Sequence, residues 1–291
     1  MSDPAALRAR AEDLAGPLPP LLAAAEQLAT TVLLGQHGRR RSGLGDEFWQ
    51  FRPASQGDEA RLIDWRRSGR SDAHFVREKE WQAAQSVTIW VDGAQSMRFA
   101  SASALPQKAY RARLLALSLS VLLVRGGERV GLTGADLPPR SGELQLLRVA
   151  AALTAEEGAA DYGAPETRGM LSHSRALFVS DYLGDPAPAA EALTAAADRG
   201  VKGALLQVLD PQEEAFPFDG RTVFESMGGS LRHETLKAGE LRGRYLERLA
   251  ERKAHLADLA QATGWQYHCH HTDAAAAGAL LWLYGALERV H

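Results

Sequence analysis

The sequence predicts an α/β fold, in which a doubly wound and mostly parallel sheet over residues 86–291 is flanked by helices. Two observations predict it. Short apolar runs alternate with longer helical runs, as in right-handed βαβ units. The apolar residues Val87, Ile89 and Val91 lead to Asp92 and a turn of small residues, and open α/β sheets place their ligands at such strand ends. We therefore expect strand 86–92 to be central, with a Rossmann-like site at its carboxyl end.

The chain divides into three expected regions. Residues 1–35 are an N-terminal helical segment, read as two Leu- and Ala-rich helices split at Gly16-Pro17 and Pro19-Pro20. Residues 36–85 are a small, charged, β-rich module. The expected strands are 46–52, 73–81, 86–92, 128–133, 175–181, 202–209, 221–226 and 265–270. The expected helices of the α/β domain, 86–291, are 105–125, 141–154, 187–199, 239–262 and 273–288.

Composition excludes several classes of protein. Hydrophobic residues make up 45% of the 291 residues, which is ample for a packed core, and the net charge of −3 gives no overall attraction to nucleic acid or anionic membrane. A single cysteine excludes an internal disulfide and fits a reducing, cytoplasmic setting. The apolar stretches Leu114–Val124 and Ala274–Leu287 are shorter than the roughly 18 residues of a membrane span, so we expect buried helices and no membrane insertion.

The charged module carries the most specific motif, FRPASQGDEARLIDWRRSGRSDAHFVREKEW, followed by VTIWVDGAQSM. With the later LRGRYLERLAERKAHLADLAQATGWQYHCHHTD, it resembles the domain of unknown function 58 family over roughly residues 36–288. The resemblance implies a core like a von Willebrand factor A domain. It also implies an adaptor role beside a MoxR-type AAA+ ATPase, in a chaperone-like or maturation system. Many members carry membrane helices before the motif, and we expect this chain to be a soluble variant.

The resemblance raises the question of a metal site, because von Willebrand A domains often hold Mg²⁺ through an Asp-x-Ser-x-Ser motif, a threonine and a distal aspartate. Asp92, Ser96 and Asp181 match three of these positions, with Asp185 as a substitute for Asp181. Ala94 replaces the middle serine, and Ala160 stands where the threonine is expected. Because Mg²⁺ demands nearly ideal geometry, we expect a degenerate site with weak Mg²⁺ binding or no cofactor at all. The alternative is that Asp92 and Ser96 bind backbone N–H groups of the following helix.

The paired charges of the module predict an internal ion-pair network, since bidentate Arg–carboxylate bonds can fix an irregular segment. A partner-docking role is the alternative, and the two can coexist. Residues 39–79 carry ten basic and seven acidic residues, too balanced for a nucleic-acid surface. Within the motif we expect Trp65 to anchor a core. The residues expected to act as partner-binding or structural groups are Arg52, Asp58, Arg61, Asp64, Trp65, Ser68, Arg70 and Arg77.

A third cluster, His268-Cys269-His270-His271, has too few donors near in sequence for a closed zinc site, and we expect a strand end instead. Phosphate-loop, nucleophile-elbow and dinucleotide glycine motifs are absent from the sequence. The chain is therefore expected to be a non-enzymatic interaction protein. Its docking surface would be the carboxyl-end rim of the sheet, here called the rim, with Asp92, Ser96, Asp161, Asp181 and Asp185. The alternative is a metal-assisted hydrolase that uses Asp92 and Asp181.

Overall fold

The computed structural model describes residues 19–36, 48–53, 65, 75–79, 84–155 and 158–288. The chain divides into two units, one formed by residues 1–37 with 85–291 and the other by residues 38–84. The first unit contains the α/β domain, and it includes the helix α2, Pro19–Gln36. The second of the two helices expected before residue 35 is therefore present, and the first lies outside the described residues.

A six-stranded sheet forms the centre of the first unit, in the order β10-β7-β6-β3-β4-β5. All neighbouring pairs are parallel except β4 with β5. Counted along the chain within this sheet, the order is 3-2-1-4-5-6, that of doubly wound folds, and it reverses between β3 and β6. The strands are β3 (Ser86–Val91), β4 (Arg129–Leu132), β5 (Leu137–Arg140), β6 (Arg175–Ser180), β7 (Lys202–Leu209) and β10 (Gln266–His271).

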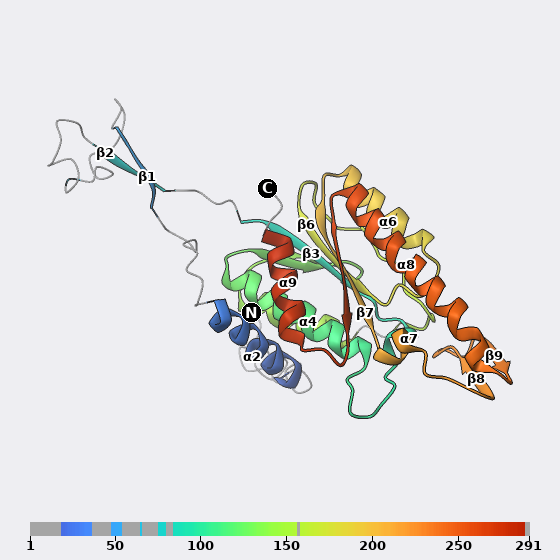
Figure 1. Cartoon of the computed structure of the whole chain (residues 1–291). Coiled ribbons are helices and arrows are strands. Elements are labelled where there is room, and N and C mark those ends of the chain that lie inside the picture. Colours follow the sequence, from blue (N-terminus) through green and yellow to red (C-terminus); the bar gives the residue numbers. More distant parts are fainter. Residues whose placement is uncertain are drawn as a thin grey trace, which may run out of the picture. The chain divides into compact units, whose positions relative to one another are not determined.

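Helices cover both faces of the sheet (Figure 1). On one face, Ile89 and Leu177 pack with α2, α4, α5 and α9, and on the other, Trp90 and Phe178 pack with α6 and α8. Strands buried on both sides carry apolar residues at nearly every position, which explains the continuous apolar runs in the sequence. The helices are α4 (Lys108–Arg125), α5 (Glu143–Ala155), α6 (Ala187–Asp198), α7 (Pro211–Ala215), α8 (Arg242–Thr263) and α9 (Ala276–Glu288).

The predicted fold class is confirmed: the sheet is mostly parallel and flanked by helices, with β3 in its interior. Two strands were not predicted. β5 contains Pro138 and Pro139, which a sheet tolerates only at an edge, and β9 (Arg232–Thr235) has no apolar run. The run expected as strand 221–226 is β8 (Thr222–Glu225), which pairs with β9 in a separate antiparallel hairpin. The helix expected at 239–262 is preceded by a 3₁₀ turn, η3 (Ala238–Leu241).

In the second unit, the strands expected at 46–52 and 73–81 are present as β1 (Phe48–Pro53) and β2 (Phe75–Lys79), and they pair antiparallel. Arg52 lies on β1 opposite Val76, and Arg77 lies on β2 opposite Phe51. Trp65 is 59% exposed, so the prediction that it anchors a core is wrong. The motif residues outside the described part of the chain are Asp58, Arg61, Asp64, Ser68 and Arg70.

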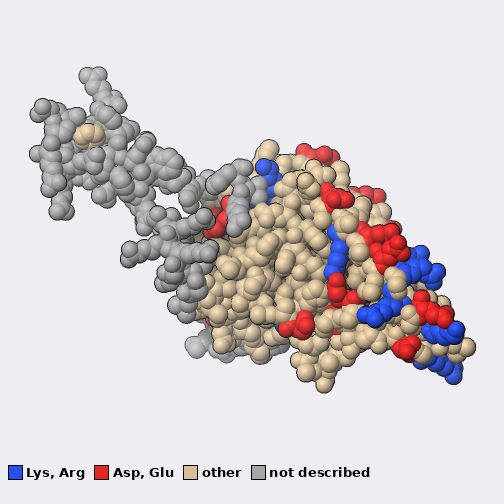
Figure 2. All heavy atoms as spheres, in the orientation of Figure 1, with Lys and Arg blue, Asp and Glu red and all other residues tan. Residues whose placement is uncertain are grey.

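Among the described residues, none of the helices combines the length and the hydropathy that a membrane span requires. Charged side chains are unevenly distributed on the first unit. Figure 2 shows Lys, Arg, Asp and Glu gathered over α8 and the β8–β9 hairpin, while the surface over α4 and α9 carries few of them.

Candidate functional site

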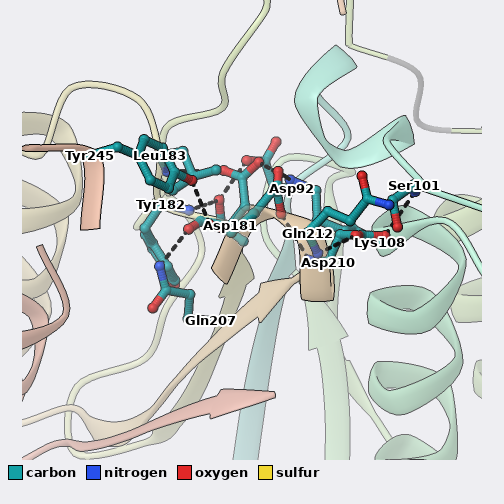
Figure 3. Close-up of polar contacts among 12 residues, drawn as sticks. Asp92, Ser101, Lys108, Asp181, Tyr182, Leu183, Gln207, Asp210, Gln212 and Tyr245 are labelled. Carbon is teal, nitrogen blue, oxygen red and sulfur yellow. Dashed lines mark hydrogen bonds and ion pairs between the residues drawn. The ribbon is translucent and has the colours of Figure 1, made fainter. Parts of the chain in front are cut away.

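Three aspartates follow three neighbouring strands of the sheet and meet at its carboxyl end. Asp92 follows β3, Asp181 follows β6 and Asp210 follows β7, and each is at most 1% exposed (Figure 3). β3 and β6 flank the point where the strand order reverses, which is where doubly wound sheets bind ligands. This edge of the sheet is therefore the candidate site.

Asp92 is held by groups of its own chain. Its Oδ1 accepts a hydrogen bond from the backbone N–H of Ala94 at 2.8 Å, and its Oδ2 accepts one from the Ser180 hydroxyl at 2.7 Å. Gly163 packs directly against the carboxylate, because a Cβ added there would overlap both carboxylate oxygens. Asp92 thus binds a backbone N–H, as one of the two sequence interpretations proposed, and backbone covers it.

A buried lysine pairs with the second aspartate. Lys108, the first residue of α4, is fully buried, and its Nζ lies 2.8 Å from Asp181 Oδ2 and 2.6 Å from Glu213 Oε1. Its ammonium also lies over the Phe99 ring, 5.8 Å from the centroid. The remaining oxygen of Asp181 accepts a hydrogen bond from the Leu183 backbone N–H. An internal cation is therefore bound at the carboxyl ends of the central strands.

Asp210 fixes the third corner of the site. It forms a capping box with Glu213 at the start of α7, accepting from the Gln212 N–H while Glu213 Oε2 accepts from the Asp210 N–H. Its other oxygen accepts from the Ser101 N–H, in the loop before α4. Glu213 is thereby oriented by the cap, which directs its Oε1 to Lys108.

The loop after α5 packs against the loop after β3. Gln95 N–H donates to the Ala160 carbonyl at 3.0 Å, and Ser96 N–H donates to the Asp161 carbonyl at 2.9 Å. Ala160 therefore lies beside the Asp92 loop with no hydroxyl to offer. The Ser96 hydroxyl is buried and has no hydrogen-bond partner among the described residues, so it caps no helix.

These contacts fit Mg²⁺ poorly. All four carboxylate oxygens of Asp92 and Asp181 already accept hydrogen bonds, and the Lys108 ammonium would repel a divalent cation next to Asp181. Mg²⁺ needs about six oxygen ligands in octahedral geometry. Ala94 and Ala160 stand where two hydroxyl ligands were expected, so those two ligands are missing. The ammonium of Lys108, paired with Asp181 and Glu213, occupies this site instead.

Burial and ion pairing shift the pKa values of Asp92, Lys108 and Glu213. Burial raises the pKa of Asp92, outweighing the hydrogen bonds from Ser180 and Ala94 that lower it. Burial alone would lower the pKa of Lys108, but its attraction to Asp181 and Glu213 raises that pKa above the usual lysine value. Burial also raises the pKa of Glu213, although Lys108 opposes that shift. Lys108 is therefore charged at neutral pH.

A recess of about 240 Å³ opens beside this network, and we call it the rim recess. Its aromatic wall is centred on Phe216, whose ring centroid lies 4.7 Å from that of Tyr245 and 5.5 Å from that of Phe224. The Tyr245 hydroxyl donates to the Glu213 carbonyl. The other lining residues are Ser96, Phe99, Asp161, Tyr162, Leu183, Gln212, Glu213, Phe218, Glu225, Ser226 and Met227.

The two remaining rim residues behave differently. Asp161 accepts hydrogen bonds from the hydroxyls of Ser226 and Ser230, so it ties its loop to the β8–β9 hairpin. Asp185 is exposed and accepts from the Ala187 N–H at the start of α6. The expected acidic rim is thus split: Asp92 and Asp181 are internal, while Asp185 faces solvent.

A partly exposed lysine contacts a carboxylate beside the histidine cluster. Within the described residues, Glu214, Cys269 and His271 bring one donor atom each within 4.8 Å of one another, but Lys253 Nζ also binds the Glu214 carboxylate. Burial raises the pKa of the Cys269 thiol, which disfavours the thiolate that a metal would need. On the other face of β10, Arg111 donates to the carbonyls of Thr272 and Ala274.

Sequence reasoning missed Lys108, Asp210 and Glu213. One signal was available: Asp210 and Glu213 are three residues apart at the start of a short helix, which is capping-box spacing. No local pattern marks Lys108, because a charged residue in the first turn of a helix is ordinarily exposed. Its burial follows from the meeting of α4, β6 and α7 in space.

Comparisons with known proteins give one family match, described as "Protein of unknown function DUF58", over residues 50–255. Among curated proteins, none matches the chain. One similar solved structure is an aerotolerance-related membrane protein from Bacteroides fragilis NCTC 9343 with multiple mutations to serines: TM-score 0.44, 15% identity, covering 71% of this chain and 100% of that one. Another is the conserved hypothetical protein BatB from Bacteroides thetaiotaomicron: TM-score 0.39, 16% identity, with the same coverage of 71% and 100%.

Proposed function

The chain belongs to the DUF58 family, and on that premise we propose that it is a non-enzymatic interaction protein that docks a partner at the rim of its von Willebrand A-like domain. The proposed partner is a MoxR-type AAA+ ATPase, and the proposed setting is a chaperone-like or maturation system in the cytoplasm. The family resemblance supports the choice of partner. The geometry of the rim supports the mode of action.

One observation carries the proposal. The strand-end carboxylates that could serve a reaction are bonded within the chain, whereas the rim recess next to them is open and partly apolar. Asp181 and Glu213 share the Lys108 ammonium, and Asp92 lies under Gly163. Concave surfaces with an apolar lining and a few polar groups are binding sites.

The hydrolase alternative gains no support from these contacts. A metal-assisted hydrolase needs carboxylates at an open position, whereas Asp92 and Asp181 are each 1% exposed and every one of their oxygens already accepts a hydrogen bond. We expect titration calorimetry with Mg²⁺ or Mn²⁺ to show weak binding or none. A dissociation constant in the low micromolar range, abolished by Asp92→Ala, would restore the metal site.

The docking test uses exposed carboxylates, since charge reversal at buried Asp181 would disrupt the fold. The tagged full-length chain is purified from its native organism after cross-linking, and the bound proteins are identified by mass spectrometry. We expect an AAA+ ATPase whose recovery falls several-fold with Asp185→Asn combined with Glu225→Gln. Asparagine can still cap α6, so the fold is retained. The matched control is Asp198→Asn, at the opposite end of α6.

Two results would contradict this proposal. Recovery of no ATPase under any condition would remove the proposed partner. Loss of the ATPase when Arg39, Arg40 and Arg41 are replaced by alanine, but not in the rim variant, would move the interface to the module of residues 36–85.

A further inference from the structure

The rim recess combines aromatic faces with hydrogen-bond acceptors. Phe216, Phe218, Phe224 and Tyr245 pack on one another and leave ring surface along its wall. Met227, at 48% exposed, stands among the lining residues. Aromatic faces carry a negative quadrupole and attract cations as well as apolar groups.

One polar group of the lining, the Ser96 hydroxyl, has no hydrogen-bond partner among the described residues, and it belongs to a residue only 9% exposed. Asp161, in contrast, accepts hydrogen bonds from the hydroxyls of Ser226 and Ser230 and from the backbone of Gly228 and Ser230. A ligand that brings an N–H donor to the Ser96 hydroxyl would give this buried group the hydrogen bond that it lacks.

The recess is also electrostatically negative. Its lining includes the carboxylates of Asp161, Glu213 and Glu225 and, within the described chain, no lysine or arginine. Lys108 lies behind it, but its charge is shared between Glu213 and Asp181. Burial and the nearby carboxylate charges raise the pKa of both Tyr162 and Tyr245, as a negative surrounding requires.

We propose that the rim recess binds an arginine side chain presented by the docked partner. A guanidinium stacks on aromatic rings, carries five N–H donors in a plane and keeps its charge at all physiological pH values. It would lie against the aromatic wall and donate to the Glu225 carboxylate and the Ser96 hydroxyl. A lysine has a compact, strongly hydrated ammonium and would use the rings and acceptors less well. This inference rests on the proposed docking function and names the group that the rim recognises.

The test uses the four methionines of the full-length chain as reporters. The protein is labelled with ¹³C at the methionine methyl groups, and acetyl-Gly-Arg-Gly-amide is titrated while methyl shifts are recorded. Met227 lines the recess, whereas Met97 and Met170 are buried elsewhere and serve as internal controls. We expect a saturable shift of Met227 alone, with a dissociation constant of about 1 mM for so small a ligand.

Matched probes and variants decide the chemistry. The citrulline peptide, which has the same shape without the charge, should bind about tenfold more weakly. Glu225→Gln should weaken arginine binding about threefold or more, and Glu234→Gln, on the other strand of the same hairpin, should not. Equal binding of citrulline or lysine peptides, equal effects of the two variants, or no shift of Met227 would each overturn the inference.

The two proposals fail separately. If the arginine peptide binds but the chain recovers no ATPase, the recess inference holds and the proposed partner is wrong. If the ATPase is recovered and a saturating amount of arginine peptide does not reduce its recovery, docking at the chain holds and the recess inference is wrong.

Discussion

Replacing Lys108 with methionine should be among the most damaging single changes to the α/β domain. The substitution keeps the length of the side chain and removes the ammonium, leaving Asp181 and Glu213 without their cation. Lys108 is 0% exposed and Asp181 is 1% exposed, so solvent cannot compensate. Removing one member of a buried ion pair costs about 3–5 kcal/mol, and we expect about 4 kcal/mol here.

The measurement is urea-induced unfolding at pH 7, followed by far-ultraviolet circular dichroism. Lys237→Met is the matched control, because Lys237 lies 2.7 Å from Glu240 but both are about 70% exposed. Exposed pairs contribute about 0–1 kcal/mol, so the control should stay close to wild type. Adding Asp181→Asn to Lys108→Met should restore about 2 kcal/mol, since it removes one of the stranded charges.

Acid provides a second check. As pH falls, Glu213 becomes protonated in the Lys108→Met variant, and the difference from wild type should shrink. The pKa of Glu213 is already raised by burial, so the difference should begin to shrink above the usual range for glutamate. If Lys108→Met is as stable as Lys237→Met, the buried pair does not organise the site and this reasoning is refuted.

Three further predictions concern stability. Because the folded state raises the pKa of Asp92, this group contributes stability that is present below about pH 4 and lost as pH rises through the folded pKa. The free energy of unfolding of Asp92→Asn should therefore equal or exceed that of wild type by up to about 1 kcal/mol at pH 7. Urea unfolding at pH 7 and at pH 4 should show that this gain vanishes in acid. Gly163→Ala should lower the free energy of unfolding by about 1–3 kcal/mol, because the added methyl group would collide with Asp92. Gly243→Ala, which has open space around it on α8, should raise it by about 0.5–1 kcal/mol. Equal melting temperatures for the two variants would contradict this prediction. The ion-pair network inferred for residues 36–85 predicts that Asp64→Ala loses about 3 kcal/mol, and an unchanged melting temperature with normal solubility would mean that these charges lie on the surface.

The sheet could be predicted because its signal is local. Each buried parallel strand is a short apolar run, and the runs Val87–Val91 and Leu177–Val179 lie in the strands that they predicted. β5 and β9 could not, since an edge strand with two prolines and a polar hairpin strand owe their pairing to neighbours. Asp92 and Asp181 were placed correctly at strand ends. The cation that pairs with Asp181 was missed because Lys108 lies 73 residues before it in sequence.

The lysine at the carboxyl end of the sheet also changes how the protein responds to its surroundings. A tethered ammonium is stoichiometric with the chain, cannot be chelated and does not exchange with Mg²⁺ or Ca²⁺ in solution. Its charge is lost only at strongly alkaline pH, because the carboxylates of Asp181 and Glu213 raise the pKa of Lys108. Complexes formed at this rim should therefore persist in EDTA, where a cation-bridged von Willebrand A-type contact would dissociate.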